Sequence, residues 1–439
     1  MTGTTPLSRN DTAWYRMDLP INLMVVNAIF RFEGPVTLAQ VRAVLGEALG
    51  RYDRFRQRVD ETRGRPRWVD CPDFDLTRHI VEETAPGDEA SLRAQIERRI
   101  TEPLDRAHPL WEMRLYQGTR GATLLVRIHH CIADGVALMQ VMLDACERAE
   151  GAGREAPRSA PRRAWYWWAL LPLSVTLWTL RFLWVNTWLV ARPRDPATIY
   201  KGALTGAKRV AWTPALPLAD IKATCASAGC KVNDLLMAAA AGALRRYAAT
   251  RGQAVVGPGV RAVVPVNMRP AKAARDLGNQ FALVSPTLPI GTHAQDERLR
   301  LVKRRMDRLK GSPEPLSTSL FLKLLGLIGR RLQHPVQRFL LDKTTLVMTN
   351  VPGPRKKLSL GGAPIADVMF WVPMFGPIGL GLSIFSYADD VRLGVLSDEA
   401  LVSDPQALAD AFVLELQELE AHYGVTCAPT PAEAHRDAA

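Results

Sequence analysis

The sequence predicts an α/β fold in which mixed sheets are flanked by helices, and three observations support this fold class. The 439 residues are 47% apolar and 23% charged, which is a globular composition. Segments with helical periodicity alternate with β-rich segments in both halves of the chain. At roughly 150 residues per domain, the length accommodates two or three domains. We therefore expect two α/β halves of similar weight.

The first half alternates β-rich segments with amphipathic helices. In Thr37–Leu49, for example, Leu38, Val41, Leu45 and Leu49 share one helical face. A Gly-bearing turn at Gln117–Gly121 joins two of the strands. The expected strands are Asn22–Phe32, His108–Gly118 and Gly121–His130, and the expected helices are Thr37–Leu49, Ser91–Leu104 and Val136–Glu150.

The second half repeats this alternation after a linker, Glu150–Arg163, that is rich in Gly, Pro and Arg. The expected helices are Leu218–Gly229, Lys231–Thr250, Asp296–Lys310, Ser317–Leu341 and Ala407–Tyr423. The expected strand-forming segments are Arg261–Pro270, Asn279–Ile290, Thr344–Arg355 and Ile378–Asp398. We therefore divide the chain into a first half (1–150), a linker region (151–207), a second half (208–425) and a disordered tail (426–439).

The linker region contains an apolar segment, Ala164–Ala191, with six of the eleven tryptophans. A membrane span needs about 20 mostly apolar residues, but Pro172 and Arg181 interrupt this run. An arginine at a helix centre costs about 2.5–3.5 kcal/mol on insertion, and Trp prefers the membrane interface. We expect a helix or helix pair lying in the interface, with a buried connector and a true span as the alternatives. The basic helices Asp296–Lys310 and Phe321–Phe339 would then help to hold anionic headgroups.

The charge and the cysteines narrow the class of protein. The formal net charge is +12, which favours anionic partners, although much of it can be solvated surface. No nucleic-acid motif is present. The cysteines show no CxxC spacing and favour free thiols in a reducing compartment; they are Cys71, Cys131, Cys146, Cys225, Cys230 and Cys427. The polar N-terminus favours a cytoplasmic protein.

The stretch "RIHHCIADG" places two adjacent histidines, His129 and His130, at the end of a predicted strand. Side chains alternate along a strand, so the two imidazoles point to opposite faces and cannot act as one unit. One should face a cleft and the other should be held in structure, but the spacing does not say which. A neutral His is a good general base near pH 7, and the chain has no GxSxG elbow that would supply a nucleophilic serine.

Asp134 and Gly135 follow where the loop turns into a helix. The Asp can cap the helix or brace the loop through an arginine, and Gly135 permits a turn or a close backbone approach. The two histidines and Asp134 would form a poor metal site, because the side chains of adjacent strand residues point apart and the sequence contains no second cluster of ligand residues. The alternative is that both histidines have only a structural role and take no part in chemistry.

"HHCIADG" fits HHxxxDG, and the chain resembles the bacterial wax ester synthase/diacylglycerol acyltransferase family. That family is similar in turn to chloramphenicol acetyltransferase and to peptide-synthetase condensation domains. Further segments resemble the family in the expected order: "PLSRNDTAWYRMD" near the start, Pro109-Leu110-Trp111, "VND" at Val232–Asp234, "PVNMRP" at Pro265–Pro270, Gly278-Asn279 and "TNVPGP" at Thr349–Pro354.

The resemblance implies a fold and roles for these residues. The fold would be two chloramphenicol acetyltransferase-like domains with a tunnel between them. His130, the second histidine of the motif, would be the general base. Asp134 would be a structural brace, and His129 and Gly135 would shape the site.

The remaining motifs have a functional and a structural interpretation. Asn279 can donate to a developing oxyanion or cap a loop. Asn233 and Asp234 start a helix, where both are ordinary caps, and Trp111 of the Pro109-Leu110-Trp111 run is expected to pack. "TNVPGP", with Asn350, Pro352 and Gly353, fixes a backbone path and is expected to be scaffold or tunnel wall.

The function that the resemblance implies is an O-acyltransferase. Acyl-CoA would be the donor co-substrate, a fatty alcohol or a diacylglycerol the acceptor, and no permanently bound cofactor or metal is expected. The protein would contact the inner membrane face or lipid droplets peripherally. The alternatives are a related acyltransferase with another donor or acceptor, such as a carrier-bound acyl chain, and a catalytically silent lipid-binding protein. Intact His130 and Asp134 argue against the silent protein.

Overall fold

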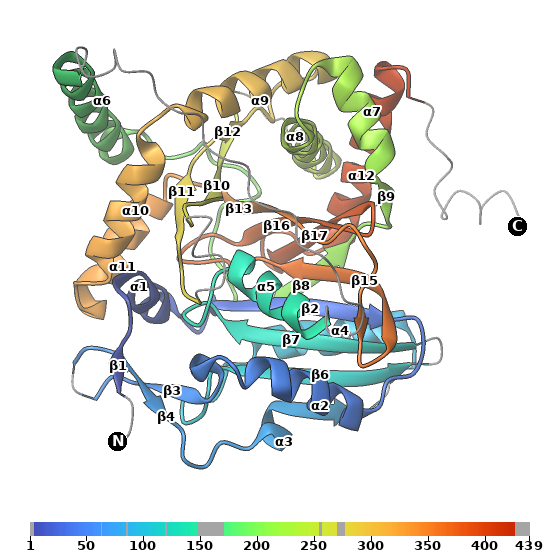
Figure 1. The fold of residues 1–439 in the computed structure, drawn as a ribbon. Coiled ribbons are helices and arrows are strands. Elements are labelled where there is room, and N and C mark those ends of the chain that lie inside the picture. The colour runs from blue at the N-terminus through green and yellow to red at the C-terminus, as the bar shows by residue number, and fades with distance from the viewer. Residues whose placement is uncertain are drawn as a thin grey trace, which may run out of the picture.

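The computed structural model describes residues 4–62, 64–84, 87–118, 121–146, 171–253, 257–269 and 277–425. Two α/β lobes are each built on a mixed sheet, and one sheet lies above the other (Figure 1). The fold class is therefore confirmed. The expected disordered tail, Cys427, residues 151–170 of the linker region and the last four residues (147–150) of the helix expected over Val136–Glu150 lie outside the described residues.

The first lobe carries a six-stranded sheet of order β14-β15-β2-β7-β6-β5 and a three-stranded sheet of order β1-β4-β3. Its elements up to the histidine pair are β1 (Thr5–Pro6), α1 (Arg9–Met17), β2 (Val25–Phe32), α2 (Leu38–Leu49), a short 3₁₀ turn (Asp53–Phe55), β3 (Gln57–Asp60), β4 (Arg67–Asp70), α3 (Leu76–His79), β5 (Ile80–Glu83), α4 (Glu89–Thr101), β6 (Trp111–Gly118) and β7 (Gly121–His129). Helix α5 (Gly135–Cys146) follows the pair.

The second lobe carries an eight-stranded sheet whose main order is β11-β10-β13-β16-β17-β8, with β12 paired to β10 and β9 to β17. Its elements are α6 (Leu171–Ala191), β8 (Lys208–Trp212), β9 (Leu216–Pro217), α7 (Leu218–Ala228), α8 (Val232–Thr250), β10 (Val260–Asn267), β11 (Phe281–Val284), β12 (Thr287–Leu288), α9 (Gln295–Lys310), α10 (Glu314–Leu325), α11 (Arg330–Leu341), β13 (Leu346–Pro352), β16 (Leu380–Tyr387), β17 (Asp390–Asp398) and α12 (Pro405–His422).

One segment of the second half crosses into the first lobe. Strands β14 (Ser359–Leu360) and β15 (Ala363–Trp371) join the first sheet, where β15 pairs antiparallel with β2. A division of the chain at residue 208 therefore misses this exchange. Because β15 and β16 follow each other in the chain but lie in different sheets, the segment between them ties the two lobes together.

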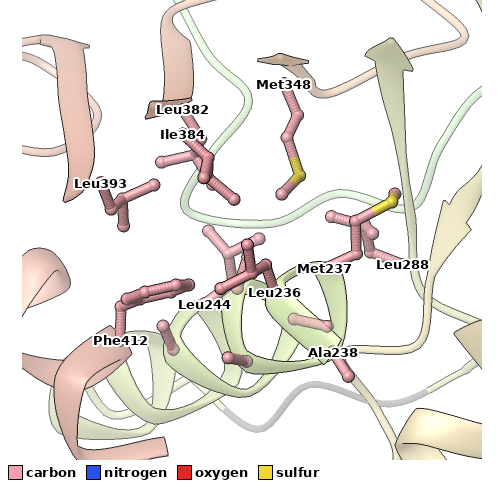
Figure 2. Close-up of a cluster of buried hydrophobic side chains, with 14 of the residues drawn as sticks. Leu236, Met237, Ala238, Leu244, Leu288, Met348, Leu382, Ile384, Leu393 and Phe412 are labelled. Carbon is pink, nitrogen blue, oxygen red and sulfur yellow. The ribbon is translucent and has the colours of Figure 1, made fainter. Parts of the chain in front are cut away.

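The core of the second lobe forms between α8 and its sheet (Figure 2). The Ala-rich helix lets the backbone lie close to Met348, Leu382 and Ile384 of the strands and to Phe412 of α12. Close approach is strictest at Gly242, where a Cβ atom would stand 2.2 Å from the Glu415 carboxylate. Burial of this apolar surface is the main stabilisation of the lobe.

Two predicted elements differ from the structure. The single helix expected over Ser317–Leu341 is two helices, α10 and α11, separated at Gly326–Gly329. At Gly326 a Cβ atom would lie 1.8 Å from the Arg9 carbonyl oxygen of α1, so the packing of α1 and not the helical periodicity sets this break. The strand expected over Asn279–Ile290 is likewise split into β11 and β12, with Pro286 between them.

The described part of the Trp-rich segment is helix α6, which lies at the edge of the second lobe beside α10 (Figure 1). Trp178, Trp184 and Trp188 are 47%, 68% and 50% exposed, so this part of the segment is not a buried connector. Among the described helices, none combines the length and the apolar character that crossing a bilayer requires.

Candidate active site

The histidine pair lies at the end of β7, against a cavity of about 450 Å³. Residues of both lobes line the cavity: Val26, Met139 and Phe370 come from the first sheet and α5, and Phe281, Val347 and Thr349 come from the second sheet. The volume lies within the range of about 300–1,000 Å³ that is usual for ligand pockets. His130 lines this cavity and His129 does not.

His130 is held on three sides. Its ring stacks on Trp14 with 4.7 Å between centroids and lies 5.6 Å from the Phe281 ring. Its Nδ1 atom is 2.8 Å from the side-chain oxygen of Asn279. An amide oxygen only accepts, so Nδ1 carries the proton and Nε2 of the neutral ring keeps its lone pair. Burial lowers the pKa of His130 below its ordinary value of 6.5, and the nearby Asp134 charge opposes this only in part.

Asn279 is fixed by the first helix of the chain. Its amide nitrogen donates to the Asp11 carboxylate at 2.8 Å and to the His130 carbonyl oxygen at 2.7 Å, and its backbone N–H donates to Asp11 at 3.1 Å. Asp11 is fully buried and pairs with Arg54 at 3.1 Å. The chain Arg54–Asp11–Asn279–His130 therefore sets the tautomer and the orientation of the imidazole.

This geometry corrects the interpretation of Asn279 as an oxyanion donor. A carboxamide has two N–H bonds, and both are used, one by Asp11 and one by His130. The Asn279 amide therefore has no N–H left to donate to a developing oxyanion. Asn279 is a positioning residue for the imidazole.

His129 occupies the opposite side of the strand. Its Nδ1 accepts the backbone N–H of Cys131 at 3.1 Å, and its Nε2 lies 3.7 Å from the Asp18 carboxylate. Burial would raise the pKa of Asp18, but hydrogen bonding and charge from His129, with Arg106 beyond, lower it to about 2. The alternation of the strand thus separates a held histidine from one at the cavity, as expected.

Asp134 performs both of the structural tasks that its position suggested. One carboxylate oxygen accepts the Ala137 N–H at 2.9 Å and so caps α5. The other accepts from the Arg269 guanidinium at 2.8 Å and from the Gln280 N–H at 3.0 Å. Arg269 and Gln280 belong to the second lobe, so Asp134 joins the two lobes beside the cavity. The Asp134 and Arg269 side chains are 6% and 2% exposed.

Two glycines of the site differ in what they require. Gly278 has φ +115°, and a Cβ atom there would stand 3.3 Å from the Arg54 guanidinium, so both backbone and space favour glycine. Gly135 begins α5 and has no atom within 4 Å of an added Cβ. It lines the cavity, so a side chain there would take space from a ligand and would not strain the fold.

The Pro109-Leu110-Trp111 run lies in the core of the first lobe and not at the cavity. Trp111 is 2% exposed, stacks on His79 at 4.5 Å and donates its indole N–H to the Phe55 carbonyl oxygen at 2.9 Å. The Leu110 carbonyl oxygen accepts the backbone N–H of His129 at 2.9 Å. The run therefore aligns the strand end that carries the histidines.

Asn233 and Asp234 have different tasks at the start of α8. The Asp234 side chain accepts the Lys231 backbone N–H at 3.2 Å and caps the helix, as expected. The Asn233 side-chain oxygen accepts from the Asn350 amide at 3.2 Å. Asn350 lines the cavity, so this pair joins the start of α8 to the cavity wall.

The end of β13 is cavity wall, as the TNVPGP segment suggested. Asn350, Val351 and Pro352 line the cavity. At Gly353 a Cβ atom would stand 2.2 Å from the Ser386 carbonyl oxygen and 2.5 Å from the Phe385 ring. The glycine thus lets β13 lie close to β16.

The cavity suits a hydrocarbon chain. Its polar lining is confined to six side chains, and the rest is aliphatic or aromatic; the six are His130, Asp134, Gln140, Asn267, Thr349 and Asn350. A smaller apolar pocket of about 60 Å³ lies under α5 and shares Val26, Met139 and Phe370 with the cavity. In the described part of the chain, no group of three His, Cys, Asp or Glu side chains is placed to hold a metal.

Sequence reasoning missed four residues that hold the site: Asp11, Trp14, Arg54 and Arg269. Asp11 and Trp14 lie in the segment that resembled the family's opening, so that resemblance was the signal that could have found them. Arg269 lies in the PVNMRP segment (Pro265–Pro270), which also resembled the family, so the same signal applies to it. Arg54 carries no such local signal, because it acts through a contact with a distant residue.

We predict that Asn279→Ala lowers kcat of the reaction at this site by about 10²-fold, because a misplaced base is penalised that strongly. Steady-state kinetics across a pH series measures it. Asn279 also favours the charged ring, so its loss moves the acid limb of the pH profile to lower pH. As a control, Asn267→Ala removes a cavity-wall amide that does not touch His130 and acts on KM. Equal kcat for both variants would contradict the positioning role.

Comparison with known proteins gives two matches to one family. Residues 7–165 match the wax ester synthase/diacylglycerol acyltransferase catalytic domain, and residues 277–420 match the WS/DGAT C-terminal domain. The protein named probable diacylglycerol O-acyltransferase tgs1 of Mycobacterium tuberculosis (strain ATCC 25618/H37Rv) is 27% identical over 420 residues, which cover 88% of this chain and 89% of that protein.

Solved structures show the same fold. The wax ester synthase/diacylglycerol acyltransferase from Marinobacter aquaeolei VT8 has a TM-score of 0.69 at 22% identity, covering 96% of this chain and all of that one. The starter condensation domain of rhizomide synthetase, in a structure with C8-CoA and Leu-SNAC, has a TM-score of 0.60 at 15% identity, covering 97% and 96%. The two-domain condensation-like architecture is therefore shared.

Proposed function

The chain belongs to the wax ester synthase/diacylglycerol acyltransferase family, and from that premise we propose that it transfers a long-chain acyl group from acyl-CoA to the hydroxyl of a fatty alcohol or a diacylglycerol. The observation that carries the proposal is the imidazole of His130, held by Asn279 with Nε2 left unprotonated, at the wall of a largely apolar cavity.

His130 acts as the general base. Nε2 takes the proton of the acceptor hydroxyl, and the oxygen attacks the thioester carbonyl carbon. The tetrahedral adduct then collapses, the C–S bond breaks, and the leaving CoA thiolate takes the proton from the imidazolium. Positioned general base catalysis supplies about 10²–10⁴ in rate, and the fixed orientation of both substrates supplies more.

The oxyanion is held at the first turn of α5. Gly135 and Val136 line the cavity, and the first N–H groups of a helix lack intrahelical partners and carry its partial positive charge. Arg269 pairs with Asp134 at 2.8 Å, so the Asp134 charge is compensated beside this turn. This assignment replaces the amide of Asn279.

The proposed partners are acyl-CoA and a lipid acceptor, at the cytoplasmic face of a membrane or at lipid droplets. The acyl chain of the donor and the hydrocarbon of the acceptor share the apolar cavity and its extension under α5.

The test is direct product analysis. Purified protein is incubated with palmitoyl-CoA and either hexadecanol or dioleoylglycerol, and the lipid products are identified by mass spectrometry. We expect palmityl palmitate, palmitoyl-dioleoylglycerol or both, and the better acceptor assigns the wax ester or the triacylglycerol reaction. Free palmitate alone, or no product, would contradict the proposal.

The pH dependence follows from the burial of His130. Because its pKa lies below 6.5, the ring is already neutral at that pH and the base is available. We predict that kcat/KM rises with pH along an acid limb centred below 6.5 and is level by neutral pH. A rate profile over a pH series measures it. An acid limb at or above 6.5 would show that another group limits the reaction.

A further inference from the structure

The exposed apolar side chains of the described residues gather on one face of the molecule. Fifteen large apolar side chains of the described residues are exposed, and twelve of them lie on α6, on α10 with the residues that follow it, and on α11. Examples are Trp184, Leu320 and Leu332, which are 68%, 47% and 61% exposed. The three helices follow one another along one side of the second lobe (Figure 1). We call this surface the α6–α10–α11 face.

Helices α10 and α11 of this face have the pattern of surface elements and not of core elements. On α10 and just after it, Leu316, Leu320, Leu324 and Leu327 recur at helical spacing and are 45–54% exposed. On α11, Leu332 and Phe339 stand seven residues apart beside an exposed Arg331 and Arg338 with the same spacing. The result is an apolar surface bordered by cations.

The charges on this face are nearly all positive. Arg181, Lys323, Arg331 and Arg338 are exposed. The one acidic residue within the three helices is Glu314, which is 9% exposed and accepts the Ser285 N–H at 2.8 Å. Exposed tryptophan, leucine and arginine without compensating carboxylates fit a lipid surface that carries anionic headgroups. Helix α6 has Arg181 midway along it, which fits a helix that lies on the surface.

A second apolar pocket of about 140 Å³ lies beneath this face. Leu189 of α6, Phe321 of α10 and Leu340 of α11 line its outer side. Leu283 and Phe375 line its inner side, and the same two residues line the catalytic cavity. The pocket therefore stands between the face and the cavity, and two side chains form the common wall.

The face is also attached to the helix that holds the base. Gln333 of α11 donates to the Ala13 carbonyl oxygen of α1 at 3.0 Å, and His334 lies 3.0 Å from the Arg16 carbonyl oxygen. Trp14 of the same helix stacks on His130. Helix α1 thus contacts the face on one side and the imidazole on the other.

We propose that the α6–α10–α11 face docks on an anionic lipid surface, and that the lipid acceptor leaves this surface through the pocket beneath the face and reaches His130 between Leu283 and Phe375. The access route rests on the proposed acyl transfer, whereas the docking does not. An acceptor insoluble in water thus passes from lipid to the cavity without crossing solvent.

Docking is tested by vesicle flotation, which needs no activity. The full chain is mixed with vesicles of phosphatidylcholine alone or with phosphatidylglycerol added. Binding is expected to the mixed vesicles, and Arg331→Gln is expected to weaken it about fivefold, since one cation near an anionic surface contributes about that much. Trp184→Gln and Leu320→Ser should weaken it further. The matched control is Leu414→Ser on α12, a leucine with the same 47% exposure as Leu320, which should bind as the native chain does.

Several results would overturn docking. Equal binding by Leu320→Ser and Leu414→Ser would do so, provided that their thermal melting by circular dichroism matches that of the native chain. So would a dimer in light scattering that only Leu320→Ser dissociates, because the face would then be an interface between copies. Absence of flotation with either vesicle would also overturn it.

The access route is tested by Leu189→Trp, which fills the pocket from the outer helix. Transfer to dioleoylglycerol held in mixed vesicles should fall at least about tenfold relative to transfer to a short soluble alcohol, because a 140 Å³ pocket cannot hold both an indole and a chain. An unchanged ratio would overturn the route. If the native chain transfers acyl groups to neither acceptor, the proposed function fails and the route with it, while the flotation result still decides docking.

Discussion

His130→Ala is expected to lower kcat of acyl transfer by about 10²–10⁴, because it removes the base that takes the acceptor proton. The cavity should survive, since Trp14 and Phe281 still form its wall around the lost ring. Thiol release from palmitoyl-CoA in the presence of acceptor measures the rate. The loss should fall on kcat much more than on KM for the donor.

The control for this variant is His108→Ala. His108 contacts Asp105 at 2.8 Å, outside the cavity, so its removal should leave the rate within about twofold of the native value. Acceptor-dependent transfer at the native rate in His130→Ala would exclude His130 as the base, even though the family assignment would stand.

Asp134→Ala is expected to lower the free energy of unfolding by about 3–5 kcal/mol, because it leaves the Arg269 guanidinium buried without its carboxylate. That side chain is 2% exposed. The substitution also removes the cap of α5 and the acceptor of the Gln280 N–H. Urea unfolding followed by circular dichroism measures the change. Because these contacts join the two lobes, activity should fall with stability.

Two further variants separate the loss of the helix cap from the loss of the buried ion pair. Asp75→Ala removes an exposed cap, the acceptor of the Thr77 N–H in α3, and should lower the free energy of unfolding far less than Asp134→Ala does. Adding Arg269→Met to Asp134→Ala should recover part of the loss, because the buried charge that Asp134 compensates is then removed as well. A loss in Asp134→Ala no larger than in Asp75→Ala would show that the buried pair adds little.

Local patterns in the sequence were enough to predict most of the elements. The helical stripe of Thr37–Leu49 became α2, with Thr37 and Gln40 capping its start. Alternation along β7 correctly separated the two histidines, and the position of Asp134 correctly suggested a cap and an arginine. Each of these predictions depends on residues that lie only a few positions apart in the sequence. Periodic patterns of apolar residues carry information over that short distance.

What escaped prediction depends on contacts between distant residues. The exchange of β15 into the first sheet cannot be read from its own pattern, because pairing with β2 joins Trp371 to Asn27. The break at Gly326 is set by the backbone of Arg9. The role of Asn279 depends on Asp11, 268 residues earlier, whose carboxylate accepts a hydrogen bond from an amide N–H that an oxyanion would need.

In the proposed mechanism the acceptor oxygen attacks acyl-CoA directly, with His130 as base and without an acyl-protein intermediate. This claim is tested by rapid-mixing measurement of thiol release, with protein in near-equimolar ratio to radiolabelled palmitoyl-CoA. We predict no release without acceptor, and release with acceptor in step with ester formation. A burst of thiol equal to the protein concentration without acceptor, with label left on the protein, would contradict the claim.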